Sequence, residues 1–297
     1  MPMHDVNYRH EHELKKHDFL GCCQDCQHSL EIIKPHIMAF AERIQRYDDE
    51  ALKALCPDDL YRLFLLLDDL APMDAGPHLA GLILDEPEIR SVLPNIRAYY
   101  NTFFSIHEVH LAEKLIASPA PWETLKSFPL YPRYEALVKN QIELNRMDGN
   151  SRLVFIGCGP VPSSLILLNH LAGVRCMGLD VSEDAVNWSR KVVGCLGLEK
   201  EIDIERGDEI LLREFDWDMV LVAAMADPKA RIFRNLRLIM REKSKTDTLV
   251  FFRTYTGMRA ILHEPVTEEE IKGFRIVRTF YPVGRVNNTV VSAKLDA

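Results

Sequence analysis

The chain has 297 residues, 47% of them hydrophobic, which is enough for a doubly wound domain of about 150 residues and a second, helical domain. Its formal net charge of −8 is unfavourable for contacts with a phosphate backbone and argues against DNA or RNA as a partner. Without a visible signal peptide or an apolar run of membrane-spanning length, we expect a cytoplasmic protein that does not bind membranes and whose seven cysteines are thiols.

Histidine and cysteine residues are concentrated at the start of the chain, at His4, His10, His12, His17, Cys22, Cys23, Cys26 and His28. Two residues separate Cys23 from Cys26, which is the spacing of many zinc-ligand pairs. One such pair without a second is weak support for a metal site, and the start of a helical domain is the simpler interpretation. We therefore predict no metal requirement, with zinc or nickel binding as the alternative.

The first half of the chain has the apolar periodicity of helices. Apolar residues recur at intervals of three and four in residues 29–47, 58–67 and 95–117. Helix breaks are expected at Pro57, residues 75–77 and Pro94. Strand patterns begin only after about residue 150, and the turn residues of RMDGN precede them. This predicts a helical domain over residues 1–148 and a second domain over residues 149–297.

One acidic residue falls on the apolar face of the last of these helices. Four residues share that face at helical spacing: Tyr100, Phe104, Leu111 and Leu115. Glu108 lies on the same stripe, and an ionised carboxylate buried without a partner costs several kcal/mol. Glu108 is therefore paired, bound to a ligand, or protonated. Two interpretations stay open: an ion pair with an arginine such as Arg133, or a general base that can also anchor an amine.

Residues 121–141, PWETLKSFPLYPRYEALVKNQ, are rich in aromatic and cationic side chains. Aromatic clusters of this kind commonly pack two domains together. This segment would, however, cover a ligand site at the carboxyl edge of a following sheet. In that position the hydroxyls of Tyr131 and Tyr134 and the guanidinium of Arg133 can orient an amino-acid substrate.

Residues 153–164, LVFIGCGPVPSS, are typical of a buried strand, a glycine turn and a helix. Gly157 and Gly159 allow a tight turn and a close approach of backbone to ligand, and Pro160 suits a helix start. Unpaired N–H groups of that helix can face a bound molecule. The third glycine of a dinucleotide motif is missing, so S-adenosylmethionine and NAD fit about equally well, with a purely structural turn as a third interpretation.

Acidic residues follow the next two predicted strands. Residues 174–179 precede Asp180, which comes roughly 20 residues after the turn, where a carboxylate can bind a ribose diol. Residues 202–206 precede Gly207, Asp208 and Glu209, which are placed to meet an adenine edge. Strands over residues 218–224 and 248–253 complete a repeating βα pattern. A single aspartate at a strand end more often caps a helix, but two of them behind a glycine turn favour an adenosyl pocket.

Several segments together resemble one known family. FIGCGPVPSS, APWETLKSFPLYPRY, VLVAAMADPKARIFRNL, FFRTYTGMRAILHEPV and GRVNNTVV lie within residues 96–292, and they resemble nicotianamine synthase, most closely its archaeal members. The resemblance implies an α/β fold, with a Rossmann-like S-adenosylmethionine-dependent transferase domain preceded by an all-helical N-terminal domain. The first 90 residues match only in helical character.

The resemblance also implies an activity. The family transfers the 3-amino-3-carboxypropyl group of S-adenosylmethionine to an amino group and releases 5′-methylthioadenosine, which here would make a nicotianamine-like metal chelator. Archaeal members imply glutamate as the first acceptor, plant members imply units derived from S-adenosylmethionine, and bacterial relatives imply histidine. One or several condensation cycles are compatible with this sequence.

Site residues are carried over at matching motif positions. Glu108 matches the catalytic glutamate and Tyr134 the substrate-orienting tyrosine of the family. The expected contacts of the adenosyl donor are Gly157, Gly159, Pro160, Asp180, Asp208 and Ala223. The expected substrate-binding residues are Tyr131, Arg133, Arg253 and Arg259, because a guanidinium fork suits an α-carboxylate. Asn287 and Asn288 match the archaeal pattern, but adjacent asparagines more often only make a turn.

Two other classes of function stay open. A small-molecule methyltransferase on the same scaffold would release S-adenosylhomocysteine instead of methylthioadenosine. A sensor built around the His/Cys cluster would bind S-adenosylmethionine or metal without turnover. The expected partner is a small-molecule amino-acid acceptor, and a homodimer is one of the compatible oligomeric states.

Overall fold

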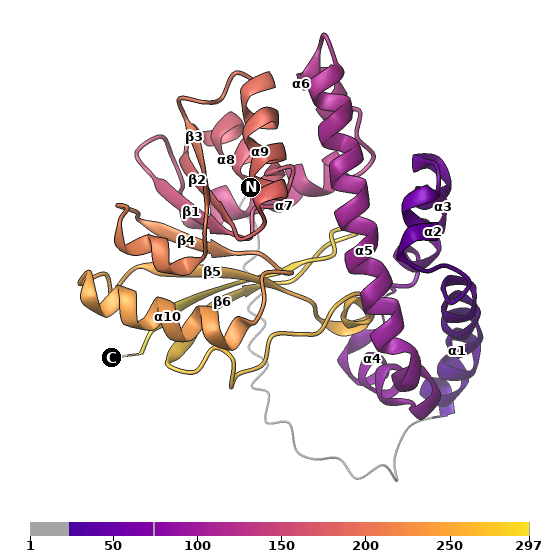
Figure 1. Ribbon diagram of the computed structural model, residues 1–297. Coiled ribbons are helices and arrows are strands. Elements are labelled where there is room, and N and C mark those ends of the chain that lie inside the picture. Colours follow the sequence, from indigo (N-terminus) through magenta and orange to yellow (C-terminus); the bar gives the residue numbers. More distant parts are fainter. Residues whose placement is uncertain (1–23, 74, 297) are drawn as a thin grey trace, which may run out of the picture.

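The computed structural model describes residues 24–73 and 75–296. The described part of the first half is helical: α1 Gln24–Ile44, α2 Asp49–Ala54, α3 Pro57–Asp68, α4 Gly76–Asp85, α5 Pro87–Ala117, α6 Pro121–Lys126 and α7 Tyr131–Asn145. Helix α5 has 31 residues and runs between α1–α4 on one side and the sheet half of the molecule on the other (Figure 1). The helical character predicted for this half is therefore correct.

Pro94 lies inside α5, so the helix break expected there is wrong. A proline inside a helix removes one N–H donor, here the donor to the carbonyl of Arg90. Pro94 and Arg90 are both exposed, and water can therefore satisfy that carbonyl. Pro57 and Pro77, in contrast, lie in the first turns of α3 and α4, where N–H groups lack a helical partner in any case.

The second half is built on a seven-stranded sheet with the order β3-β2-β1-β4-β5-β7-β6. The strands are β1 Arg152–Ile156, β2 Arg175–Asp180, β3 Ile202–Arg206, β4 Met219–Val222, β5 Leu249–Thr254, β6 Phe274–Phe280 and β7 Thr289–Leu295. The connecting helices are α8 Ser163–Ala172, α9 Glu183–Cys195 and α10 Lys229–Glu242, with the short 3₁₀ helices η2 Glu209–Arg213 and η3 Gly257–Ile261. Strands β1 to β5 are parallel and coincide with the five predicted strands.

The antiparallel strands β6 and β7 complete the sheet and were not predicted. Strand β6 is at the edge, and most of its side chains are exposed on both faces. An irregularity in the pairing between Ile276 and Arg278 also interrupts its alternation. The sequence of β6 therefore lacks the period of two that identifies a half-buried strand.

Two separate apolar cores cover the two faces of the sheet. Leu153 and Phe155 of β1 belong to the core that also contains residues of α8, α9 and the N-terminal helices. Val154 and Ile156 belong to the other core, beneath α10. Burial on both faces explains the uninterrupted apolar run of β1. The first core continues from α1 to the sheet, so the helical half and the sheet half share one interior.

The remaining expectations about the whole chain can be placed on this fold. None of the described helices is long and apolar enough to cross a membrane. Among the described cysteines, Cys56, Cys158, Cys176 and Cys195 are free thiols. Of the His/Cys cluster, only Cys26 and His28 are among the described residues, so the prediction made for that cluster lies mostly outside them.

Candidate active site

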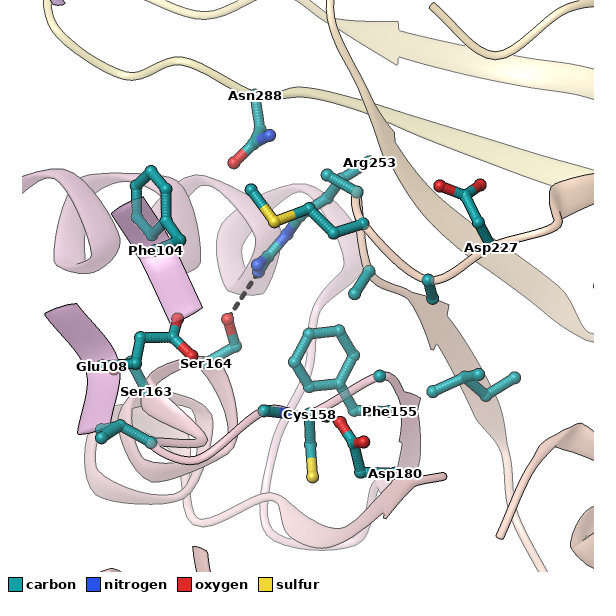
Figure 2. Close-up of a pocket in the computed structure, with 18 of the residues that line it drawn as sticks. Phe104, Glu108, Phe155, Cys158, Ser163, Ser164, Asp180, Asp227, Arg253 and Asn288 are labelled. Atoms are coloured by element: carbon teal, nitrogen blue, oxygen red, sulfur yellow. Dashed lines mark hydrogen bonds between the residues drawn. The ribbon is translucent and has the colours of Figure 1, made fainter. Parts of the chain in front are cut away.

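A cavity of about 340 Å³ lies at the carboxyl ends of β1 and β4. Small-molecule sites commonly enclose about 300–1,000 Å³, and ligands of open α/β sheets bind at this edge. Both halves of the chain contribute to its wall, which includes Phe104, Glu108, Arg133, Tyr134, Gly157, Gly159, Asp180, Asp208, Ala223, Arg253 and Asn288. Figure 2 shows Glu108 on one side, Asp180 and Cys158 below, and Asn288 at the opposite end from Asp180.

The turn after β1 brings backbone to the cavity surface. Gly157 and Gly159 have φ values of 79° and 72°, in the left-handed region that favours glycine. The N–H groups of Gly157 and Cys158 donate to the carbonyl of Leu179, which ties the turn to β2. A Cβ on Gly157 would lie 2.8 Å from Cβ of Ala226, and a Cβ on Gly159 would lie 2.8 Å from Oε2 of Glu108. A side chain at either position would therefore collide with the cavity wall.

Glu108 projects from α5 into the cavity (Figure 2), and its Oε2 lies next to Gly159. Within the described part of the chain, no hydrogen bond or ion pair satisfies its carboxyl group. Burial, and then the charge of Asp180, raise the pKa of Glu108 to about 8. The ion pair with Arg133, one of two interpretations of the sequence, is not formed, because Arg133 pairs with Asp68. Glu108 is therefore a half-buried acid that no cation of the described residues neutralises.

Arg253, near the end of β5, is buried in the same cavity. Its Nη2 donates to Oγ of Ser164 at 2.8 Å, and its guanidinium lies 5.4 Å from the centre of the Phe155 ring. Its Nε has no hydrogen-bond partner. Burial lowers the pKa of Arg253 to about 10, which still leaves the group charged at neutral pH.

The charge of Arg253 is not balanced by the protein. Among the described residues, two further arginines line the cavity, and both are paired: Arg133 with Asp68, and Arg231 with Glu209. Arg253 has no acidic partner in the described chain. A buried cation without a counter-ion is costly, and a guanidinium is well shaped to bind a carboxylate. Arg253 is thus suited to an anionic group of a ligand.

Tyrosine hydroxyls form another part of the cavity wall. Burial, followed by the charge of Glu108, raises the pKa of Tyr134 far above its usual range, so its hydroxyl remains neutral. The hydroxyls of Tyr100 and Tyr255 lie 3.4 Å apart in the same cavity. A neutral phenol can both donate and accept a hydrogen bond. Tyr134 can therefore orient an amine next to Glu108.

The acidic residues at the strand ends have partners in the turn structure. Asp180 accepts 2.9 Å hydrogen bonds from the N–H groups of Gly159 and Ser182. Asp208 accepts a 3.0 Å bond from the N–H of Ile210 and caps η2. Both carboxylates also line the cavity, as does Ala223. A strand-end aspartate can therefore accept hydrogen bonds from the backbone and still face a ligand, so these two roles need not exclude each other.

Three of the residues proposed from the sequence do not line the cavity. Pro160 lies in the turn, outside the cavity lining. The hydroxyl of Tyr131 donates to Glu135 at 3.5 Å. Arg259 donates to the carbonyls of Val286 and Gly284, at 2.8 and 2.7 Å, and so fixes the connection that precedes β7.

Comparison with known proteins relates this geometry to a family. The model of the family described as nicotianamine synthase protein matches residues 26–297. The chain belongs to the nicotianamine synthase family. The resemblance inferred from the sequence motifs is confirmed.

Solved structures of the family share this architecture. A mutant of MtNAS in complex with S-adenosylmethionine is 34% identical and has a TM-score of 0.82, and the alignment covers 93% of this chain and 100% of that one. A complex of MtNAS with MTA and tNA matches equally well. This agreement confirms the predicted fold class, a Rossmann-like sheet preceded by helices.

Relatives of known activity are more distant. Nicotianamine synthase 1 from Arabidopsis thaliana is 23% identical over 266 residues, which cover 84% of this chain and 82% of the relative. The L-histidine 2-aminobutanoyltransferase of Pseudomonas aeruginosa strain UCBPP-PA14 is 24% identical over 140 residues, which cover 47% of this chain. The match spans about half, 52%, of the length of that transferase.

For this member of the nicotianamine synthase family, the sequence left some cavity residues unidentified. Asn287 and Asn288, interpreted as a turn, both line the cavity, and so does Tyr255. Asp68, which holds Arg133, is 1% exposed. A signal for Asp68 was present, because Leu60, Phe64, Leu67 and Asp68 share a helical face. Asp68, like Glu108, is an acidic residue on an apolar stripe of its helix.

Proposed function

We propose that this protein transfers the 3-amino-3-carboxypropyl group of S-adenosylmethionine to the amine of an amino acid and releases 5′-methylthioadenosine. One observation carries the proposal: the half-buried carboxyl group of Glu108 and the buried guanidinium of Arg253 line the same cavity, and neither has an oppositely charged partner among the described residues. Membership of the nicotianamine synthase family and the 34% identity to MtNAS in its S-adenosylmethionine complex support the donor.

The residues present fit an adenosyl donor. Gly157 and Gly159 line the cavity without side chains, which lets a ligand approach their backbone closely. Asp180 and Asp208 offer carboxylate oxygens at the adjacent edge, where a ribose diol and an adenine amine can donate hydrogen bonds. Ala223, with its small side chain, lines the wall between β4 and this edge. We therefore place the adenosyl group at the glycine turn.

Bound S-adenosylmethionine supplies a sulfonium centre with three electrophilic carbons, of which the one held in line with the nucleophile reacts. Arg253 binds the α-carboxylate of the methionine arm and so directs that arm, instead of the methyl group, toward the acceptor. Glu108 accepts the proton of the attacking amine. The new C–N bond forms at the γ-carbon as the C–S bond breaks, and the released electron pair stays on sulfur as a neutral thioether.

The protonation of Glu108 suits this sequence of events. With a pKa of about 8, its carboxyl group is mostly protonated at pH 7 in the free protein. A cation in the cavity favours the carboxylate and lowers that pKa. Glu108 therefore becomes a base when the sulfonium and the ammonium are present. The hydroxyl of Tyr134 donates or accepts a hydrogen bond next to Glu108 and aligns the attacking amine.

In this proposal the two halves of the chain have different roles. Residues 1–148 supply the base, the orienting tyrosine and the acceptor side, and residues 149–297 supply the donor pocket. Glutamate, histidine and a unit derived from S-adenosylmethionine are the acceptors to compare. A nicotianamine-like chelator is the expected product, in one or more cycles.

The test is incubation of the protein with S-adenosylmethionine and each acceptor, followed by chromatography of the nucleoside and mass spectrometry of the product. We expect methylthioadenosine, and a product mass that gives the acceptor and the number of transferred groups. Glu108→Gln is the matched control and should release little nucleoside. Release of S-adenosylhomocysteine would replace the proposal with a methyltransferase, and binding without any product would replace it with a sensor.

A further inference from the structure

A buried carboxylate outside the proposed catalytic pair organises one end of the cavity. Asp68, at the end of α3, is 1% exposed and accepts four hydrogen bonds. Nη1 and Nη2 of Arg133 donate to its two oxygens at 2.6 Å each, Nη1 of Arg285 donates at 3.0 Å, and Nδ2 of Asn287 donates at 3.2 Å. These four residues, here termed the Asp68 cluster, join α3, α7 and the connection between β6 and β7.

The carboxylate of Asp68 fixes the orientation of the Asn287 amide. An ionised carboxylate only accepts hydrogen bonds, so it faces the NH₂ group of Asn287 and not its carbonyl. The oxygen Oδ1 of Asn287 is consequently turned away from Asp68, and it is buried without a hydrogen-bond partner. Asn287 lines the cavity. The cluster therefore provides one unused acceptor at the cavity wall.

Arg133 provides unused donors at the same wall. A guanidinium has five N–H donors, and the two bonds to Asp68 are the hydrogen bonds that the structure gives for Arg133. Arg133 lines the cavity and its side chain is 16% exposed. Asp68 thus neutralises Arg133 and holds it in place while leaving part of its fork accessible. An arginine and an amide oxygen then stand together beside the cavity.

Asn287 of the Asp68 cluster lines the cavity together with its neighbour Asn288. Asn288 is at the opposite end of the cavity from Asp180 and Cys158, with Glu108 and Arg253 between them (Figure 2). A group bound next to the cluster would therefore be separated from the glycine turn by the proposed base. That is the position required of an acceptor whose amine Glu108 deprotonates.

We infer that Asp68 is a positioning residue for the acceptor, since it presents N–H donors of Arg133 and Oδ1 of Asn287 as a pair complementary to the carboxylate and ammonium of an amino acid. This inference rests on the proposed function. Stability alone is a weak reason for the arrangement, because apolar residues of similar volume often replace a buried ion pair without loss of stability. The four hydrogen bonds to this carboxylate instead fix the positions of Arg133, Arg285 and Asn287.

The test separates acceptor binding from donor binding. Asp68→Asn keeps the shape but places an NH₂ group against the donors of Arg133, Arg285 and Asn287. We expect its KM for the acceptor to rise at least tenfold, while calorimetry gives a dissociation constant for S-adenosylmethionine within twofold of the wild-type value. Asp69→Asn is the matched control: Asp69 is exposed and bonds only to the rim residue Arg285, and its KM should stay within twofold.

Asn287→Leu keeps the test decisive if Asp68→Asn does not fold. It removes the amide without removing a charge, and it should also raise the acceptor KM at an unchanged affinity for S-adenosylmethionine. The inference is overturned if a folded variant leaves the acceptor KM unchanged, or if donor affinity falls in the same proportion. A wild-type protein that forms no methylthioadenosine would instead overturn the proposed function, and the inference with it.

Discussion

Two acids in one cavity have opposite environments. Asp180 accepts two backbone N–H bonds, whereas Glu108 has no such donor, and burial and then the charge of Asp180 raise the pKa of Glu108 to about 8. A carboxyl group with a pKa near the working pH is suited to proton transfer. The contrast supports the proposed roles, which are proton transfer for Glu108 and ligand binding for Asp180.

Glu108→Gln tests the first of these roles. The amide preserves shape but cannot take a proton, so turnover should fall by about 10²–10⁴-fold while S-adenosylmethionine still binds. The same change should raise the melting temperature at pH 9. A carboxyl group whose pKa is about 8 in the folded state and 4.5 in the unfolded state loses its contribution to stability as the pH rises toward 8. Unchanged turnover, or a lower melting temperature than wild type at pH 9, would contradict this account.

Asp180→Asn tests the electrostatic link between the two acids. Removing the charge of Asp180 removes one cause of the raised pKa of Glu108. The rise of kcat/KM with pH, which follows ionisation of the base in the free enzyme, should therefore shift to lower pH, and donor affinity should weaken. Asp208→Asn is the control, since Asp208 is not a cause of that shift. A profile that moves equally in both variants would disprove the link.

Residue-level prediction from the sequence succeeded where local periodicity carried the information. Glu108 was found because its helical stripe is local, but the partner of Arg133 lies 65 residues earlier in the chain, at Asp68. Arg253 lines the cavity and Arg259 does not. This difference depends on tertiary structure, because in the folded chain Arg253 bonds to Ser164 and Arg259 to Val286. Sequence spacing contains no signal for such pairings.

At the scale of the elements, apolar runs were sufficient for β1, β4 and β5, because strands buried on both faces have distinctive sequences. The exposed edge strand β6 lacks that signal. Helix α5 shows the converse problem. Its tertiary packing against helices on one side and α9 on the other outweighs the local preference of Pro94 for a break.

His107, next to the proposed base on α5, is a packing residue. Its ring lies 4.8 Å from the ring of Phe103, 5.1 Å from that of Phe128 and 5.7 Å from that of Tyr61, measured between centres. Both ring nitrogens are buried without a hydrogen-bond partner. Burial lowers the pKa of His107 to about 4, so the folded protein keeps this ring neutral at neutral pH.

His107→Phe should therefore stabilise the protein, because it removes unpaired buried nitrogens and retains the aromatic contacts. The gain should be larger at pH 5 than at pH 7.5. The unfolded chain binds a proton at His107 below about pH 6.5, and the folded protein does so only near pH 4, so wild-type stability falls as the pH decreases between these values. Thermal melts at both pH values check this, and a variant less stable than wild type at pH 5 would show that the imidazole is needed.

At the scale of the whole molecule, the helical half and the sheet half are joined by more than a linker. They share the core that runs from α1 to β1. Arg97 of α5 donates to the carbonyl of Ala260 at 2.9 Å, and Nε1 of Trp122 donates to the carbonyl of Leu196 at 3.2 Å. The cavity is enclosed by both halves, so its geometry depends on this contact surface.

Because the core is shared, unfolding in urea should be a single transition. Far-UV circular dichroism, dominated by helices, and tryptophan fluorescence, which reports Trp122 in α6 of the helical half and the buried Trp217 beneath α10, should give the same midpoint. S-adenosylmethionine at 100 times its dissociation constant should raise the free energy of unfolding by about 2.7 kcal/mol in both signals, since the sheet half that holds its proposed pocket should unfold together with the helical half. A circular dichroism transition at lower urea than the fluorescence transition would mean that the helical half unfolds alone, and a ligand effect confined to fluorescence would mean that donor binding does not stabilise the helical half.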